Sequence, residues 1–488
     1  MGDVAMESFE ELQERLGAAW ALNKPGVGVD HVLVVLPSFS VGESLLSHYA
    51  DRIPALEHRY LLAALMLHRI EACEMVFLST TPPGDEVLRY YLSLAGPYAS
   101  ARDRFRHFAV PDMSARSVAA KALDRPDILE EIRKTIAGRP AFIEPWNVTD
   151  DEVAVAMQLE VPIDGTDPKL WPLGYKSSGR RLFREAGVPT PAGREDVRTV
   201  DDVVPAIEAI RAERAAVPGV VVKLDNSGAG DGNIVLRFDS ASQEGGVDGG
   251  LRARIEALPD WFLEELRGGG IVEELIAGER FTSPSVQVDI TPSRDVEVLA
   301  THEQVLGGET GQVYTGCRFP ADPAYAARLA RYGRAVGEQL AGRGALGRFS
   351  LDFAVASNRA GRADVYALEI NLRKGGTTHP YTTLRNLVPG RYDSEGGRWV
   401  AADGTSRWYR STDNLVDDAW LGLPPSMAID AVAKPGLQFD HRSGTGVVLH
   451  MLSSLAIDGR FGLTAIGASM EQAEELYEAA AAAIPGRS

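Results

Sequence analysis

The sequence predicts a mixed α/β and α+β protein, and three observations support this fold class. The chain has 488 residues, enough for about three domains at roughly 150 residues each. Up to about residue 165, short apolar runs alternate with helical patterns, which favours a parallel sheet with helices on both faces. Further along, apolar runs follow one another at the spacing of hairpins, which favours antiparallel strands. We therefore expect three regions, 1–165, 166–390 and 391–488.

The first region is expected to contain the parallel sheet. Its expected strands are 31–38, 74–80 and 140–145. Its expected helices lie near 41–51, at about 57–73 and at 125–138. The turn after the first strand, PSFSVGES, lacks the glycine spacing of a dinucleotide-binding loop. Ser40 in this turn fits a helix N-cap better than a nucleophile.

The middle and C-terminal regions are expected to be rich in strands. The expected strands are 219–224, 233–238, 270–278, 285–292, 295–305, 348–356, 363–373 and 446–452. The expected helices are a segment that ends at Gly187, then 200–217, 323–342 and 470–484. The segment 396–408 is expected to form an exposed excursion or a hairpin.

Composition excludes several classes of protein. The 50 basic and 68 acidic residues give a net charge of −18, which disfavours non-specific binding to nucleic acid or to an anionic membrane. No run of 18 apolar residues occurs, and the acidic start of the chain does not resemble a signal peptide. The two cysteines form no C-x-x-C motif, which argues against a disulfide framework and a thiolate zinc site. We expect a cytoplasmic protein that binds neither nucleic acid nor membrane.

A glycine-rich loop, DNSGAGDGN, lies between two expected strands. Gly228, Gly230 and Gly232 would let backbone N–H groups approach an anion closely, because no Cβ atom intervenes. Lys223, at the end of the preceding strand, can reach the same anion. A strand rather than a helix follows, so the loop would close over phosphates as a flap. The alternative is a glycine-rich hairpin turn beside a solvated lysine.

Carboxylates gather at the end of the strand near residue 272. Glu273 and Glu274 end an apolar run, and a turn leads to Glu279. This pattern suits hydrogen bonds to an adenine amino group and to ribose hydroxyls, with the backbone of Leu275 and Ile276 at the adenine edge. The alternative is an edge strand with solvated glutamates.

Three oxygen-bearing residues occur in two apolar strands. Asp352 lies in the run FSLDF, and Glu369 and Asn371 share one face of the strand ALEIN. A carboxylate in an apolar strand is costly unless it is paired or binds a metal, and these oxygens suit Mg²⁺. Arg373 continues the same face and could clamp a phosphoryl or carboxylate oxygen. The alternative is a buried acid–arginine ion pair.

The turn KGGTTH directly follows this strand. Its Lys374, Gly375 and Thr377 would offer hydrogen-bond donors to an acyl group. His379 is either a base or a structural residue. The chain contains no H-E-x-x-H and no G-x-S-x-G motif, which argues against a zinc peptidase and a serine hydrolase.

The order of these features resembles that of the ATP-grasp ligases. Lys176, Lys223 with the glycine loop, the carboxylates at 273–279, Asp352 and Glu369-x-Asn371 follow one another as in that family over about 170–390. The flanking segments VVLPSFSVGESLL, LEVPIDG, GYKSSGRRLFREAGVPTPAG and FDHRSGTGVVLHML are similar to the pheganomycin-type peptide ligases. The resemblance implies an ATP-grasp fold with an N-terminal Rossmann-like pre-ATP-grasp domain and a small C-terminal domain.

The resemblance also implies roles for single residues. Lys176 and Lys223 would hold the α- and β-phosphates of ATP beneath the loop 228–232. Glu273, Glu274 and Ile276 would line the adenine and Glu279 the ribose; Asp352, Glu369 and Asn371 would hold two Mg²⁺ ions; Arg373 would face the transferred phosphoryl group or the acyl substrate.

The implied activity is ATP-dependent ligation of a carboxylate to an amine through an acyl phosphate, in peptide natural product metabolism. The substrates would be a small-molecule carboxylate and an amino-acid or peptide amine, and a homodimer is common in this fold. Two alternatives stay open at this point. The enzyme could use a nucleophile other than an amine, or the chain could be a nucleotide-binding module without catalysis.

Overall fold

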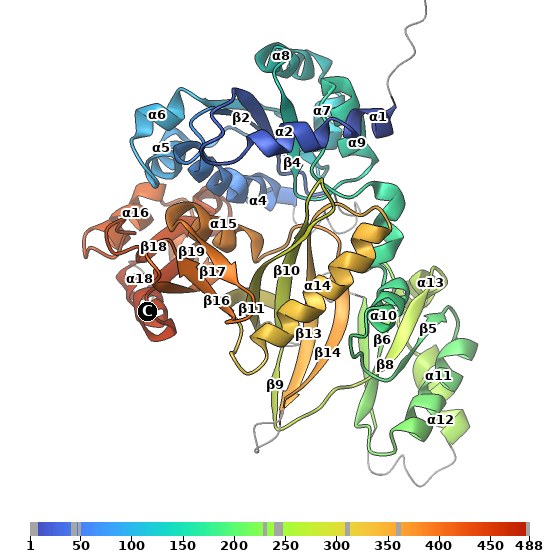
Figure 1. The fold of residues 1–488 in the computed structure, drawn as a ribbon. Coiled ribbons are helices and arrows are strands. Elements are labelled where there is room, and N and C mark those ends of the chain that lie inside the picture. The colour runs from blue at the N-terminus through green and yellow to red at the C-terminus, as the bar shows by residue number, and fades with distance from the viewer. Residues whose placement is uncertain are drawn as a thin grey trace, which may run out of the picture.

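Three β-sheets make up the core of the protein (Figure 1). The structure is a computed structural model. It describes residues 8–40, 46, 50–227, 232–238, 247–307, 313–357 and 363–484. The three sheets follow one another along the chain, and residues of the second and third sheets and of the helix 176–185 contribute the candidate site.

The N-terminal sheet is four-stranded and parallel, as expected, in the order β3-β2-β1-β4. Its strands are β1 (His31–Leu36), β2 (Cys73–Ser79), β3 (Phe105–Ala109) and β4 (Ala141–Pro145). The central run HVLVVL is buried throughout, because alternate residues enter two different cores. Leu33 and Val35 face one core, and Val32 and Val34 face the other. Strands were thus predicted at β1, β2 and β4, and only β3 was missed.

Helices cover both faces of this sheet. They are α1 (Phe9–Gln13), α2 (Leu16–Leu22), α4 (Ile53–His58), η2 (Arg59–His68), α5 (Asp85–Ser93), α6 (Tyr98–Arg102), α7 (Val118–Leu123), α8 (Pro126–Ile136) and α9 (Asp150–Leu159), with a short turn η1 (Ala50–Arg52). The helix predicted at 125–138 is α8. The single helix predicted at 57–73 is wrong, because the chain forms α4 and then the 3₁₀ helix η2. The helix expected near 41–51 falls almost entirely outside the described residues.

The second sheet is four-stranded and antiparallel, in the order β5-β8-β6-β7. Its strands are β5 (Gly193–Val197), β6 (Gly219–Leu224), β7 (Asn233–Arg237) and β8 (Gly270–Glu274). The associated helices are the 3₁₀ helix η3 (Pro168–Gly174), α10 (Lys176–Glu185), α11 (Val200–Glu213), α12 (Val247–Glu256) and α13 (Asp260–Leu266). The hairpin β6–β7 encloses the glycine loop, so this loop joins two strands as predicted.

The third sheet has eleven strands and extends across the predicted boundary at residue 390. Its main path is β14-β13-β10-β11-β12-β17-β16-β15, with β9 beside β13 and with β19 and β18 beyond β17. The bounds are β9 (Arg280–Thr282), β10 (Pro284–Ile290), β11 (Val296–Gly307), β12 (Val313–Phe319), β13 (Gly347–Ser357), β14 (Ala363–Asn371), β15 (Gly390–Asp393), β16 (Arg398–Ala401), β17 (Ser406–Val416), β18 (Gly446–His450) and β19 (Arg460–Gly467).

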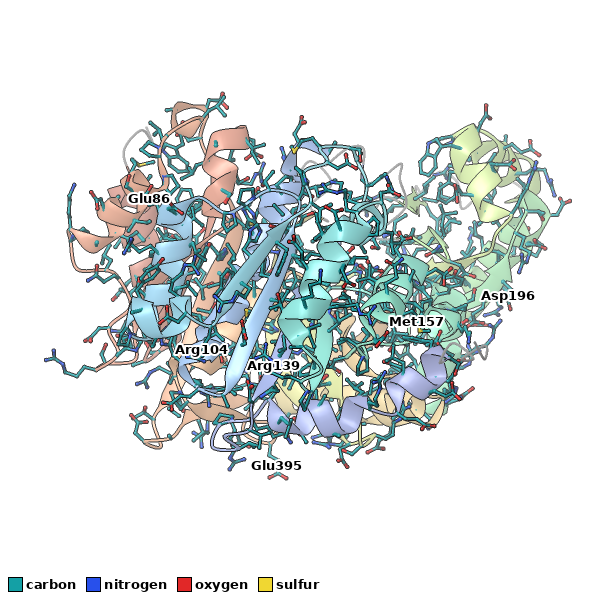
Figure 2. The ribbon with its side chains drawn as sticks, turned by 90° about the horizontal axis from the view of Figure 1, so that it is seen from above. Glu86, Arg104, Arg139, Met157, Asp196 and Glu395 are labelled. Atoms are coloured by element: carbon teal, nitrogen blue, oxygen red, sulfur yellow. The ribbon has the colours of Figure 1, made fainter. Side chains whose placement is uncertain are left out.

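The remaining helices include α14 (Ala326–Gly342) and α18 (Met470–Ala483), which pack against strands of this sheet. The others are α15 (Thr378–Leu387), the 3₁₀ helix η5 (Asp418–Trp420), α16 (Pro425–Ala433), the 3₁₀ helix η6 (Leu452–Ser454) and α17 (Leu455–Asp458). Seen from above, Glu86 of α5 and Asp196 of β5 lie near opposite sides of the molecule (Figure 2). None of the described helices is long and apolar enough to cross a membrane.

The segment 396–408 forms the hairpin β16–β17, with Trp399 paired to Arg407. The expectation that this segment is exposed is wrong for Trp399, which is only 1% exposed. Its ring lies edge-on to that of Tyr381, with 6.1 Å between centroids. The hairpin therefore helps to close the core between the first and third sheets.

Gly462 of β19 is expected to tolerate no side chain. A Cβ atom there would lie 2.2 Å from His450 Nδ1 and 2.7 Å from the Thr412 carbonyl oxygen. We expect Gly462→Ala to lower the free energy of unfolding by about 2 kcal/mol, because backbone and a buried ring would have to move. The matched control is Gly250→Ala in α12, where nothing lies within 4 Å. Urea denaturation should show Gly250→Ala unchanged or slightly stabilised, and equal midpoints for both variants would contradict the prediction.

Candidate active site

Asp352, Glu369 and Asn371 meet where β13 and β14 lie side by side. Asp352 is paired with Glu369 across the two strands, and Asn371 follows on the same face. Asn371 Nδ2 donates to Asp352 Oδ2 (2.8 Å) and to Glu369 Oε1 (3.0 Å). Gln304 of β11 donates from Nε2 to Asp352 Oδ1 (2.6 Å). The three residues singled out in the sequence thus form one oxygen-rich cluster.

The two carboxylates of this cluster differ in their electrostatics. Burial, with the Glu369 charge next to it, raises the pKa of Asp352 to about 7. Burial also acts to raise the pKa of Glu369, but Lys176, Asn371 and Lys223 outweigh it and hold that pKa below its ordinary value. Two close carboxylates and an amide form an all-oxygen set of the kind that Mg²⁺ prefers. The donor set therefore fits the predicted metal.

Lys176 connects the glycine loop to the oxygen cluster. It opens α10, and its ammonium donates to the carbonyl oxygen (2.9 Å) and the hydroxyl (3.0 Å) of Ser227. The same nitrogen lies 3.6 Å from Glu369 Oε2. Of the predicted glycines, Gly228 and Gly230 lie outside the described residues. Gly232 packs on Ser227, where a Cβ would come within 2.4 Å.

Glu273 is enclosed by two cations. It is 1% exposed, and its Oε2 lies 2.6 Å from Lys223 Nζ. Its Oε1 accepts from Arg180 of α10, and Arg180 also bonds Glu195 (2.9 Å). Both oxygens of Glu273 are therefore engaged within the protein, in contrast to the adenine contact that the family resemblance implied. Arg180 was not singled out from the sequence, although a glutamate in an apolar strand calls for a buried cation.

The segment after β8 links the second sheet to the loop before β5. Glu274 Oε1 accepts from the backbone N–H of Ala192 (2.7 Å). The backbone N–H of Leu275 donates to the Gly219 carbonyl oxygen (2.9 Å). Ile276 is half-buried, and Glu279 is exposed. The predicted adenine-binding segment thus leaves the sheet beside the starts of β5 and β6.

Arg373 lies between the oxygen cluster and the N-terminal sheet. Its guanidinium stands 4.8 Å from the ring centre of Trp146, and its Nη1 donates to the Lys374 carbonyl oxygen (3.0 Å). Burial lowers the pKa of Arg373, against the opposing charges of Glu369 and Asp352. Arg373 therefore stands over the aromatic surface of the first domain, within electrostatic reach of the carboxylates.

The turn that follows Arg373 is anchored by its own side chains. Lys374 Nζ donates to Glu144 Oε1 (3.0 Å) and to the Pro145 carbonyl oxygen (2.7 Å). Burial opposes ionisation of Glu144, but Lys374 and Arg348 lower its pKa to about 2. The backbone N–H of Gly375 donates to Thr378 Oγ1 (3.0 Å), and Thr377 is buried. The Lys374 side chain, predicted to contact a substrate, instead ties the turn to β4.

His379 belongs to a buried polar group centred on Asp413. His379 Nε2 lies 2.7 Å and His450 Nδ1 3.6 Å from Asp413 Oδ1, while Arg59 Nη1 donates to Asp413 Oδ2 (2.7 Å). Burial lowers the pKa of His379 below its ordinary value and that of His450 to about 3. Arg59, Asp413 and His450 come from distant segments, so no local pattern could have indicated them. His379 therefore contacts Asp413 within the protein.

Comparisons with known proteins identify related families and chains. A family model described as "IQCH-like, ATP-grasp" matches residues 256–394, and one described as "PGM1 C-terminal domain" matches residues 427–480. The L-propargylglycine–L-glutamate ligase of Streptantibioticus cattleyicolor is 33% identical over 395 residues, which are 80% of this chain and 80% of that protein. IQ motif-containing protein H of Danio rerio is 27% identical over 339 residues, 58% of this chain and 32% of that protein.

Solved structures share the fold at low sequence identity. An N5-carboxyaminoimidazole ribonucleotide synthetase in complex with ADP has a TM-score of 0.52 at 13% identity, covering 94% of this chain and 97% of the other. The biotin carboxylase of Campylobacter jejuni has a TM-score of 0.57 at 13% identity, covering 93% and 90%. Both alignments include all three sheets of the chain over most of their length.

Proposed function

Since the chain belongs to the ADP-forming ATP-grasp ligases of the peptide-forming type, we propose a ligase function for it. The enzyme joins a small-molecule carboxylate to the amine of an amino acid or peptide. The observation that supports this best is the cluster of Asp352, Glu369 and Asn371 beside Lys176. An all-oxygen set next to a buried lysine suits a phosphate chain with its metal. We place the activity in peptide natural product metabolism.

We assign the metal to the oxygen cluster. Asp352, Glu369 and Asn371 would hold Mg²⁺, with two ions as the expected number. When bound, Mg²⁺ neutralises phosphate charge and orients the phosphates for transfer. Asn371 now points its amide nitrogen at both carboxylates, and the carbonyl oxygen of the same amide supplies the ligand atom. The three side chains face one another, and a half-turn of the Asn371 amide would exchange its nitrogen for its oxygen at this place.

The nucleotide would lie between the second and third sheets. Lys176 and Lys223 would contact its phosphates under the loop 228–232, of which Gly232 is described. Glu274 and Ile276 would line the adenine and Glu279 the ribose. We assign Glu273 a positioning role, because it holds Lys223 and Arg180 in place through ion pairs.

The reaction needs no nucleophile from the protein. A carboxylate oxygen of the first substrate attacks the γ-phosphorus, the bond to the β-phosphate oxygen breaks, and ADP leaves. The amine of the second substrate then attacks the acyl carbon, loses a proton, and phosphate leaves as the amide forms. Arg373, with Gly375 and Thr377 of the following turn, would stabilise the negative charge of the transferring groups and hold the acyl group. The protein mainly positions the substrates and neutralises the charge of the transferring groups.

ADP release with Mg-ATP tests the proposal. We expect ADP only when both a carboxylate and an amine are supplied from a panel of amino acids and dipeptides, and a hydroxamate when hydroxylamine replaces the amine. EDTA should abolish both products, and excess Mg²⁺ should restore them. ADP release without any carboxylate, or a hydroxamate without ADP, would contradict the acyl-phosphate route.

We also propose a homodimer and a cytoplasmic location. Sedimentation velocity at micromolar concentration should give about twice the mass of the chain, and a monomer at all concentrations would rule out the dimer.

A further inference from the structure

Where the N-terminal sheet meets the third sheet, four buried hydrogen-bond donors have no partner among the residues that the structure describes. We name them the donor cluster: Arg59 Nε, Tyr60 Oη, Trp146 Nε1 and Arg348 Nη1. Arg59 and Tyr60 are each 7% exposed and Trp146 is 5% exposed. Buried polar groups have partners in more than about 90% of cases, so four such donors in one place need an explanation.

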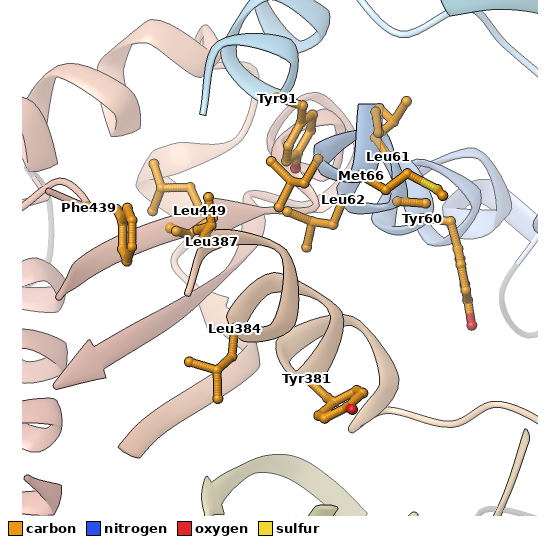
Figure 3. Close-up of a cluster of buried hydrophobic side chains, with 14 of the residues drawn as sticks. Tyr60, Leu61, Leu62, Met66, Tyr91, Tyr381, Leu384, Leu387, Phe439 and Leu449 are labelled. Atoms are coloured by element: carbon orange, nitrogen blue, oxygen red, sulfur yellow. The ribbon is translucent and has the colours of Figure 1, made fainter. Parts of the chain in front are cut away.

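The donor cluster is one physical site. Phe39 stacks on Trp146 with 4.0 Å between ring centroids, and the Arg59 guanidinium lies 5.6 Å from the Phe39 ring. Arg59 is also 5.9 Å from the ring of its neighbour Tyr60. Trp146 and Arg348 line the same pocket. Tyr60 lies at the edge of the hydrophobic cluster in Figure 3, and its hydroxyl points away from Met66 and Tyr91.

This site adjoins the position of phosphoryl transfer. Arg373 lines the same pocket as Trp146, and the charges of Arg59, Arg348 and Arg373 all act on the Tyr60 hydroxyl. Among these three arginines, only Arg59 has a carboxylate within ion-pair distance in the described part of the chain, namely Asp413. Carboxylates act on the other two at longer range: Glu144, Asp289 and Asp164 on Arg348, and Glu369 and Asp352 on Arg373. What the site has in excess is therefore hydrogen-bond donors.

We propose that the donor cluster binds a carboxylate of the substrate that does not react. A carboxylate accepts hydrogen bonds at both oxygens and would supply acceptors for the donors that have no partner among the described residues. Asp164 Oδ1, a buried acceptor without a partner, lines the same pocket and suits a nearby ammonium group. The proposal rests on the proposed ligase function and deepens it, because it assigns a place in the protein to a substrate carboxylate that does not react.

Tyr60→Phe is the variant that tests this inference. It removes an unpartnered hydroxyl, so the melting temperature should not fall. A hydrogen bond to a charged group is worth about 1.5–3 kcal/mol, so KM for the recognised substrate should rise about tenfold or more while kcat changes little. Tyr91→Phe, in the core of the same domain (Figure 3), is the matched control and should leave KM unchanged.

Blocked substrates show which molecule supplies the carboxylate. On the acid side, L-glutamate is compared with glutamine and isoglutamine; on the amine side, alanine is compared with alaninamide. In one arm, blocking should raise the wild-type KM at least tenfold and should also remove the effect of Tyr60→Phe. An unchanged KM for Tyr60→Phe in both arms, with ADP still formed, would show that ordered water alone fills the site and would overturn this inference. Absence of ADP with every pair would count against the proposed function instead.

Discussion

Replacing Glu369 by glutamine is expected to lower kcat for ADP release by a factor of about 100 to 1,000, the range found when a single group that stabilises the transition state is removed. Glutamine keeps the size of the side chain and can still meet Asn371, but it removes the negative charge beside Asp352. Lys176, 3.6 Å from Glu369 Oε2, would also lose its carboxylate neighbour. Initial rates at saturating substrates across a range of Mg²⁺ concentrations measure the effect, and the Mg²⁺ requirement should increase as well.

The matched control is Glu131→Gln on α8. Glu131 is exposed on the N-terminal domain, and its side chain belongs to neither the oxygen cluster nor the nucleotide contacts. This variant should retain the wild-type rate and Mg²⁺ dependence. If Glu369→Gln formed ADP as fast as Glu131→Gln, the oxygen cluster would not be the metal site, and the assignment of Asp352 and Asn371 would be lost with it.

The residues of the oxygen cluster were predictable because each stands out from the sequence immediately around it. Side chains alternate along a strand, so Glu369 and Asn371 were bound to share a face once β14 was recognised. Asp352 is an acid in an apolar run. Because burying an unpaired carboxylate in a strand costs free energy, Asp352 can be identified as a candidate site residue without knowing its neighbours. What the sequence did not contain was the strand pairing, which places Asp352 opposite Glu369.

Partners from distant segments could not be predicted. Arg180 and Lys223 meet at Glu273 although they are 43 residues apart, and Arg59 and Asp413 are 354 residues apart. The pairing of β17 with β12, which joins the C-terminal strands to the central sheet, is likewise a long-range contact. Local sequence periodicity does not predict such pairs, because they arise from the topology of the fold and from the need to neutralise buried charge.

Glu273→Ala is expected to cost about 3–5 kcal/mol of the free energy of unfolding, the largest loss of stability among the changes considered. Glu273 is buried between Arg180 and Lys223, and both cations are themselves mostly buried. Without the carboxylate, Arg180 retains Glu195, but Lys223 would remain in an apolar sheet without its 2.6 Å partner. Urea denaturation of the purified variant measures the loss, and KM for ATP should rise because Lys223 is no longer held in place.

A control variant distinguishes the effect of losing a buried carboxylate from the effect of losing an exposed ion pair. Glu213→Ala removes the carboxylate partner of Arg194, but this pair is exposed, with side chains 50% and 39% accessible, so the loss should stay below about 1 kcal/mol. Adding Lys223→Met to Glu273→Ala should recover part of the stability, since methionine has no charge to leave uncompensated. If the double variant were no more stable than Glu273→Ala, the cost would come from lost packing rather than from an unpaired lysine.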